Sequence, residues 1–184
     1  MKDDDLGCEI DCDNPLMEVA DSVFVDQPNE HMRFRDHGGW SEILVPGEFT
    51  RSEHREDVCG VVLTLAKLRG SKHVYIRILH PILNEQPRCA RVESGFEKFI
   101  EFETFGFEDL TLSDYISFDE SGTWGVYSYG NEFGYTAVGG RDGFVREVVA
   151  ALGGLDKLKS DFERYQGVDE RILQAARASC KWPV

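Results

Sequence analysis

The chain has few cysteines, and they are not arranged in regular pairs. Its 184 residues include five, at Cys8, Cys12, Cys59, Cys89 and Cys180. A disulfide-stapled domain or a zinc finger requires paired cysteines or histidines at short, regular spacings. Only the first two are close together, as CxxxC, and no second pair follows them. We therefore expect free thiols in a reducing compartment, no disulfide and no metal site.

Long apolar runs are absent as well. The longest, from Val58 to Leu68, is interrupted by Thr64 and Lys67 and is too short to cross a bilayer. The opening residues, MKDDDLG, are acidic, which is the reverse of the basic start of a secretory signal. These features predict a soluble, cytoplasmic protein that has no membrane partner.

No catalytic signature stands out. Cys59 lies near His54, but two residues five positions apart on a helix do not share a face. Ser121 lies in ESGTWG rather than in a G-x-S-x-G elbow. Gly139-Gly140 precedes a predicted helix, but no lysine follows to complete a phosphate loop. We expect no cofactor and favour a binding protein; the alternative is a hydrolase-like enzyme that uses carboxylates or Cys59.

Basic residues are scarce. The chain has 34 acidic residues against 20 lysines and arginines, a net charge of −14. The excess is concentrated in residues 1–30 and 93–132, each with ten acids, one base and a net charge of −9. Such a field repels nucleic acid and anionic membranes and attracts basic partners. The other interpretation is that the acidic blocks serve solubility alone.

The first part of the chain changes pattern near residue 20. Residues 1–20 show no clean periodicity, which predicts an acidic, flexible N-terminal arm followed by a single α+β domain over 21–184. Alternation of apolar and polar residues then predicts short strands at 22–25, 32–35 and 40–45.

The segment Thr50–Gly70 is ambiguous. Thr50 precedes Glu53 at a capping-box spacing, and the apolar residues that follow fall on one helical face. Gly60 and the β-branched valines favour instead one arm of a hairpin, whose second arm is the strand predicted at 73–79. We favour the helix over the hairpin.

The stretch from Asp114 to Gly140 predicts a β-meander. Three apolar runs, at 115–118, 124–129 and 133–138, are separated by turns rich in glycine and acidic residues. In the first turn, Gly122 supplies a residue that tolerates a positive φ. The glycines therefore have a structural role at the strand ends.

The second strand of this meander presents different residues on its two sides. Trp124 and Val126 share one side, which we expect to face the core, whereas tyrosines occupy the other. If the tyrosine side is open, it makes a docking face of aromatic anchors with an acidic rim. Its residues are Asp119, Glu120, Tyr127, Tyr129 and Glu132. The alternative is that both sides are buried and the tyrosine hydroxyls only reach the edge.

The remaining segments are predicted to be helical. A short amphipathic helix is predicted within 93–106, a helix capped by Asp142 over 142–152, and helical segments from 155 onwards. The fold class predicted is α+β. A mainly antiparallel sheet, built from the N-terminal strands and the central meander, is packed by helices and followed by a helical C-terminus.

One part of the chain resembles a known class of proteins. The run FDESGTWGV from Phe118, then a strand, a double glycine and FVREVVAALGG, resembles small bacterial immunity-type proteins, which are found beside toxins. The resemblance covers about residues 114–154, roughly a fifth of the chain. It implies a protein-binding role and transfers no functional residues. Together with the acidic blocks, it leads us to expect an immunity-type inhibitor that docks on a basic protein partner such as a toxin.

Overall fold

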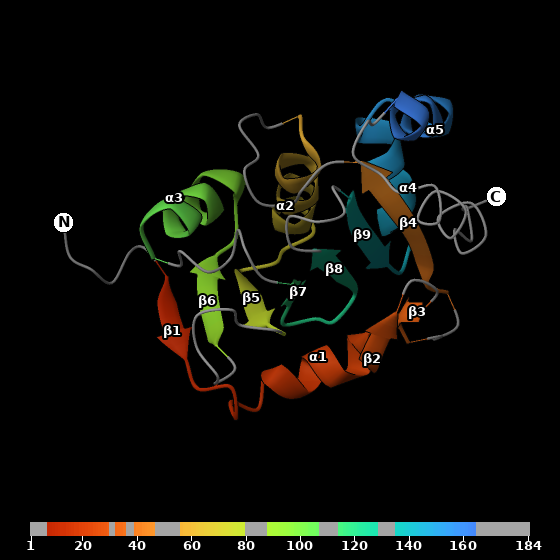
Figure 1. Cartoon of the computed structure of the whole chain (residues 1–184). Helices are drawn as coiled ribbons and strands as arrows, with labels where there is room; N and C mark the ends of the chain where they lie inside the picture. Colours follow the sequence, from red (N-terminus) through yellow and green to blue (C-terminus); the bar gives the residue numbers. More distant parts are fainter. Residues whose placement is uncertain are drawn as a thin grey trace.

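The described part of the computed structural model has three layers. It comprises residues 7–29, 32–35, 39–46, 56–79, 88–106, 114–128 and 135–164. A seven-stranded sheet forms the middle layer, with helices above one face and a helix with a two-stranded sheet below the other (Figure 1). Segments of the same chain therefore cover both faces of the central sheet.

The central sheet is antiparallel between all neighbouring strands. Its order is β1 (Cys8–Ile10), β6 (Cys89–Glu93), β5 (His73–Ile78), β7 (Tyr115–Asp119), β8 (Trp124–Ser128), β9 (Tyr135–Gly140) and β4 (Ser41–Pro46). The strands β7, β8 and β9 are consecutive in sequence and in space, which confirms the predicted meander. The antiparallel sheet with its packed helices confirms the predicted α+β class.

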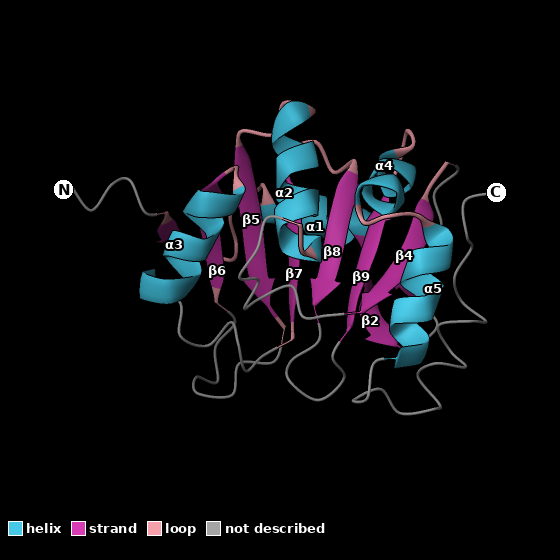
Figure 2. Ribbon diagram, turned by 90° about the horizontal axis from the view of Figure 1, so that it is seen from above, coloured by secondary structure: helices cyan, strands magenta, loops and turns pink. Residues whose placement is uncertain are grey.

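Four helices form the upper layer, here called the helical layer. They are α2 (Val58–Leu68), α3 (Phe96–Gly106), α4 (Phe144–Ala151) and α5 (Leu155–Arg164), spread across the sheet in Figure 2. Alternate residues of the strands point up into this layer, and Trp124 stacks there on Phe144 with ring centroids 5.7 Å apart. The core of this layer consists of aliphatic and aromatic side chains, which bury apolar surface from both the helices and the sheet.

The sequence left a helix and a hairpin open for residues 50–70, and the structure has a helix there, α2. Residues 58–68 are helical, and Gly70 follows them with φ +96°, the left-handed conformation that commonly ends a helix. The predicted capping box at Thr50 and Glu53 lies outside the described residues. The helix predicted within 93–106 is confirmed as α3.

The lower layer, here called the N-terminal layer, covers the other face. After β1 it contains α1 (Met17–Val23), β2 (Phe24–Asn29) and β3 (Met32–Phe34). Phe24 and Phe34 lie 5.2 Å apart between their ring centroids and press against the sheet. Glycines of the sheet allow this approach, since a β-carbon on Gly125 would stand 2.7 Å from Phe24 Cζ, and one on Gly139 2.9 Å from the Phe34 ring.

The N-terminal layer corrects the prediction that residues 1–20 form a flexible arm. Residues 1–6 lie outside the described residues, but 8–10 form an edge strand of the sheet and 17–23 form α1. Met17, Ala20 and Val23 are buried at successive three-residue intervals, so one face of the short helix is in the core. The boundary expected between residues 20 and 21 therefore falls inside a packed helix.

Two element boundaries also differ from the predictions. The strand expected from residue 22 begins at Phe24, because Ser22 and Val23 belong to the last turn of α1, in which Val23 is buried. Gly139 and Gly140 belong to β9 rather than to a loop before the next helix. The helix α4 begins after Gly143, which is left-handed, and no side chain caps it, so Asp142 is not its cap.

Candidate functional site

The turn between β7 and β8 holds two of the predicted docking residues in internal contacts. Asp119 is only 3% exposed. Its carboxylate accepts hydrogen bonds from the Ser71 hydroxyl, from the Ser121 hydroxyl at 2.6 Å and from the Ser121 amide at 3.0 Å. The Trp124 indole N–H in turn donates to the Ser71 hydroxyl at 3.3 Å. Asp119 therefore fastens the turn to the loop before β5.

Glu120 has a similar structural position. Its carboxylate oxygens accept the backbone amides of Lys72, at 3.0 Å, and of His73, at 3.4 Å. These contacts tie the β7–β8 turn to the first residues of β5. Polar groups close to a core need hydrogen-bond partners, and these two carboxylates accept hydrogen bonds from the donors around them.

Tyr127 is buried, as in the alternative arrangement in which both sides of the strand are covered. It is 3% exposed, and it packs in the core beneath the N-terminal layer. Its hydroxyl donates to the Asp114 carboxylate at 3.3 Å, near the start of β7. Trp124, on the opposite side of β8, is 1% exposed. At these two residues the alternative arrangement holds, in which both sides of the strand are covered. Tyr129 and Glu132 lie outside the described residues.

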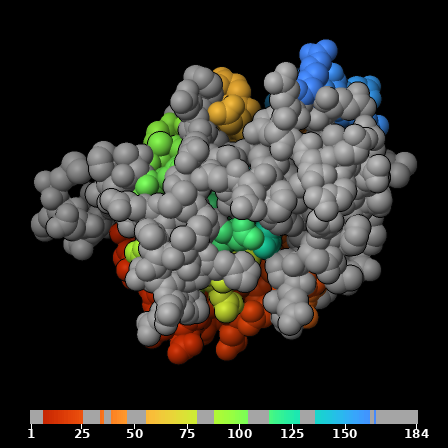
Figure 3. All heavy atoms as spheres, in the orientation of Figure 1, coloured from red at the N-terminus to blue at the C-terminus, as the bar shows by residue number. Residues whose placement is uncertain are grey.

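A group of exposed carboxylates lies instead near the start of the described chain. Five acidic side chains between Gly7 and Val25 are exposed: Glu9, Asp11, Asp13, Glu18 and Asp21. The sequence contains no lysine, arginine or histidine from residue 3 to residue 30. The N-terminal residues, red in Figure 3, form the lower surface of the molecule in that view. Glu9 belongs to β1 and is registered with Ala90, which faces the helical layer, so we call the other four residues, Asp11, Asp13, Glu18 and Asp21, the acidic face.

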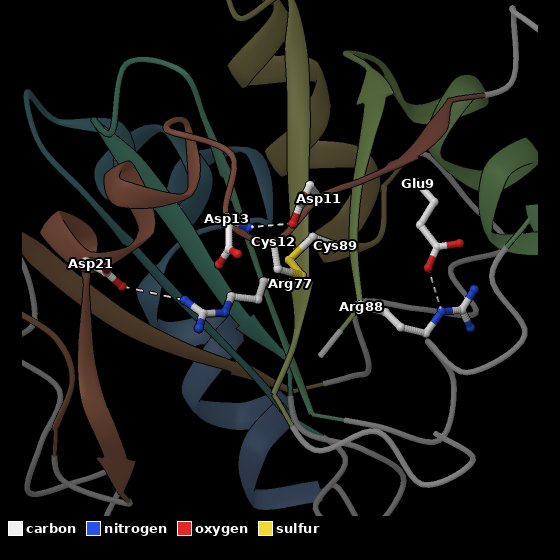
Figure 4. Close-up of a disulfide and its surroundings, with 8 residues drawn as sticks. All are labelled: Glu9, Asp11, Cys12, Asp13, Asp21, Arg77, Arg88 and Cys89. Carbon is white, nitrogen blue, oxygen red and sulfur yellow. Dashed lines mark hydrogen bonds and ion pairs between the residues drawn. A yellow bond between two sulfur atoms is a disulfide. The ribbon is translucent and has the colours of Figure 1, made fainter. Parts of the chain in front are cut away.

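Arginines from the sheet border the acidic face. Arg88 Nε lies 3.1 Å from Glu9 Oε1, and Arg77 NH1 lies 3.6 Å from Asp21 Oδ1 (Figure 4). Both carboxylates are more than half exposed, so these pairs contribute little to folding stability. The pairs leave three acidic side chains, at 11, 13 and 18, for which the structure gives no ion pair with a described residue.

A disulfide joins the N-terminal layer to the sheet. Cys12 and Cys89 are bonded, with their Cα atoms 5.3 Å apart and 77 residues between them in sequence (Figure 4). This corrects the expectation that none of the cysteines forms a disulfide; among the described residues, Cys8 and Cys59 take no part in one. Disulfides persist in oxidising compartments and are rare in a reducing cytoplasm. The bond therefore weighs against the predicted cytoplasmic location, which stays a prediction.

The residues considered for catalysis are not assembled into a site. Cys59 is fully buried in α2, within the core of the helical layer, and His54 lies outside the described residues. In the part of the chain that the structure describes, no three His, Cys, Asp or Glu side chains are grouped as metal ligands. Ser121 donates to Asp119 and contacts Thr123, with no histidine among these contacts.

Two of the described side chains have shifted pKa values, and neither shift marks a catalytic centre. The Arg69 guanidinium, which hydrogen-bonds both oxygens of Glu147, lowers the pKa of that carboxyl. Burial, reinforced by the Glu120 carboxylate, raises the pKa of the Tyr75 hydroxyl. The first group is an exposed ion pair, and the second is a core tyrosine held neutral.

Comparison with known proteins assigns the chain to no family. No protein-family model matches it, and no curated protein or solved structure matches it significantly. Among residues 7–164, as far as they are described, no helix is long and apolar enough to cross a membrane.

Proposed function

We propose that the protein is a non-enzymatic binding protein whose acidic face docks on a basic protein partner. The observation that carries the proposal is the segregation of charge: four exposed carboxylates lie on the N-terminal layer, and the sequence has no base from residue 3 to residue 30. A surface of one sign steers an oppositely charged partner and raises the association rate. The docking surface proposed is this face rather than the buried Tyr127.

The acidic face is attached firmly to the rest of the molecule. The buried residues Met17, Ala20 and Val23 hold α1 against the sheet, and the Cys12–Cys89 bond anchors the segment that precedes it. Carboxylates fixed in this way lose less conformational freedom on binding than carboxylates on a flexible arm. The arrangement therefore supports a defined interface rather than a solubilising tail.

An inhibitor of a basic toxin is the role that we propose for such a surface. The resemblance of residues 114–154 to immunity-type proteins supports it, and neutralising a toxin requires only binding. No observation on the described residues supports the alternative of a hydrolase-like enzyme. Cys59 is inaccessible, and Asp119 and Glu120 are engaged by donors within the protein.

The proposal is tested by affinity capture from the native host with three immobilised proteins. The first is the wild type, and the second carries Asp11→Asn, Asp13→Asn and Glu18→Gln on the acidic face. The third, a matched control, carries Glu56→Gln, Asp142→Asn and Asp156→Asn, which neutralise three exposed acids associated with the helical layer. Both triple variants change the net charge equally.

We expect one or more basic proteins to be retained by the wild type and by the control, and to be lost from the acidic-face variant. This pattern separates docking on a particular surface from attraction to net charge. Equal retention by all three proteins, or loss from the control alone, would refute the assignment of the docking surface.

A further inference from the structure

One arginine interrupts an apolar row that crosses the central sheet. Directly registered residues of neighbouring strands put their side chains on the same face. The row that faces the N-terminal layer is Ile10, Cys89, Arg77, Ile116, Tyr127, Ala137 and Leu44. Arg77 is its only charged member, and its neighbours in the row belong to the core beneath this layer.

A pocket of about 180 Å³ lies at Arg77, between the N-terminal layer and the sheet. Ala20 and Phe24 line it from the α1 and β2 side, and Ile116 and Tyr127 line it from the sheet. The polar residues Arg77 and Asp21 line it as well. Figure 4 shows the Arg77 side chain running from beside the disulfide towards Asp21. The pocket thus combines apolar side chains with one cationic and one anionic group, Arg77 and Asp21.

The guanidinium of Arg77 has donors available for a ligand. Within the described part of the chain, the one side-chain ion pair or hydrogen bond of Arg77 is the ion pair with Asp21, at 3.6 Å from Nη1, which is beyond hydrogen-bond distance. Its side chain is 35% exposed and lines the pocket. A guanidinium offers five N–H donors in a planar fork that matches a carboxylate.

We propose that this pocket binds a small organic monocarboxylate whose apolar body is about the size of one aromatic ring. An apolar protein cavity of about 150 Å³ is known to take up benzene, so a pocket of about 180 Å³ fits a ring of this size. The carboxylate pairs with Arg77, while the ring lies against Phe24 and Ile116. This site shares Asp21 with the acidic face proposed for protein docking, but it requires an anion rather than a basic partner.

Asp21 competes with such a ligand. Its carboxylate is 65% exposed and reaches the guanidinium from the rim of the pocket, so an incoming carboxylate takes its place. Removing the charge of Asp21 therefore favours the ligand, and removing the charge of Arg77 abolishes the attraction. A purely structural ion pair has no such asymmetry between its two members.

The test is a titration followed by NMR, with benzoate as the probe. The methyl signals of Ile116 and Leu79, which both line the pocket, report binding. Benzylamine, which carries the opposite charge, and neutral benzyl alcohol are the ligand controls. We expect saturable shifts of these methyl groups with benzoate at millimolar concentration, and at least tenfold weaker binding of the other two compounds.

Four variants complete the design. Arg77→Gln should weaken benzoate binding at least tenfold, and Asp21→Asn should strengthen it severalfold. Arg88→Gln and Glu9→Gln disrupt the neighbouring ion pair and should leave the binding unchanged, since neither residue lines the pocket. Thermal unfolding verifies that each variant is folded; Asp21 is largely exposed, so its variant is informative even if Arg77→Gln is unstable. The proposal is overturned if benzoate and benzylamine bind alike, if no saturable shift occurs, or if Asp21→Asn weakens binding.

Discussion

Gly122, in the turn between β7 and β8, lies directly against Val19 of helix α1. A β-carbon at position 122 would stand 2.9 Å from Val19 Cγ1, and Gly122 has φ +59°. The close approach is one of the points at which the meander supports α1, the helix that carries Glu18 and Asp21 of the acidic face. A glycine required by the turn therefore also fixes the position of the proposed docking surface.

The first prediction concerns this contact. Gly122→Val should lower the free energy of unfolding by about 1–3 kcal/mol, because a β-branched residue is strained at positive φ, and the new side chain also meets Val19. Gly70→Val is the matched control: Gly70 has φ +96°, but a β-carbon there meets nothing within 4 Å. Urea unfolding measures both. A loss at Gly122 no larger than the loss at Gly70 would mean that the contact with Val19 is not restrictive.

The second prediction concerns the two sides of β8. Trp124→Ala and Tyr127→Ala should each destabilise the protein by about 3–5 kcal/mol, because both side chains are buried. Tyr127→Phe keeps the ring and loses the hydrogen bond to Asp114, so its cost should be about 0.5–1.5 kcal/mol. Chemical denaturation distinguishes these values. If Tyr127→Ala were as stable as the wild type, the open tyrosine face would be the correct arrangement.

The disulfide gives the third prediction. Cys12→Ser should lower stability by about 2–5 kcal/mol, because the bond closes a long loop of sequence separation 77. The Cys12→Ser substitution should also increase the rate of amide hydrogen exchange in α1. Cys8→Ser, which removes an exposed free thiol four residues away, is the control and should change neither quantity. Equal stability of the two variants under oxidising conditions would show that the bond does not hold the N-terminal layer.

The fourth prediction uses the pKa of Glu147. Arg69 lowers this pKa in the folded state, so the ion pair stabilises the protein above the unfolded-state pKa. That contribution is lost as the pH falls through the lowered folded-state pKa. Arg69→Gln should return the pKa of Glu147 to its ordinary range, which an NMR titration measures. The effect on stability should be small, since Glu147 is 51% exposed. An unchanged Glu147 pKa in the variant would rule out this cause.

The meander and α2 were predictable because their signals are local. Turn residues separate β7, β8 and β9, and an apolar face of helical period runs through α2. The strand β6 was missed: its five residues, CARVE, acquire their structure from pairing with β1 and β5, which are distant in sequence. The helix α1 was also missed, because it has seven residues and no side-chain cap, and tertiary packing stabilises it.

The site was less predictable than the fold. Whether the tyrosine side of β8 is open depends on whether another segment covers it, and no periodicity within the strand reveals this. Gly125 and Gly139 were the local signal, since glycines inside strands mark a close approach of another segment. Arg77 also had a local signal in the sequence, because it is a charged residue that alternates with the isoleucines of β5. The pairing of Cys12 with Cys89 had no local signal in the sequence, because it depends on the strand order.

The central claim is that the acidic face steers a basic partner onto the protein. Its most direct test is the association rate of the captured partner, measured by stopped-flow mixing at low and at physiological salt. Exposed charges are screened over about 8 Å at physiological salt, so the wild-type rate should fall as salt rises. We predict that Asp11→Asn, Asp13→Asn and Glu18→Gln together flatten this salt dependence, whereas the helical-layer control variant keeps the wild-type slope. A rate independent of salt, or the same slope in all three proteins, would contradict the account.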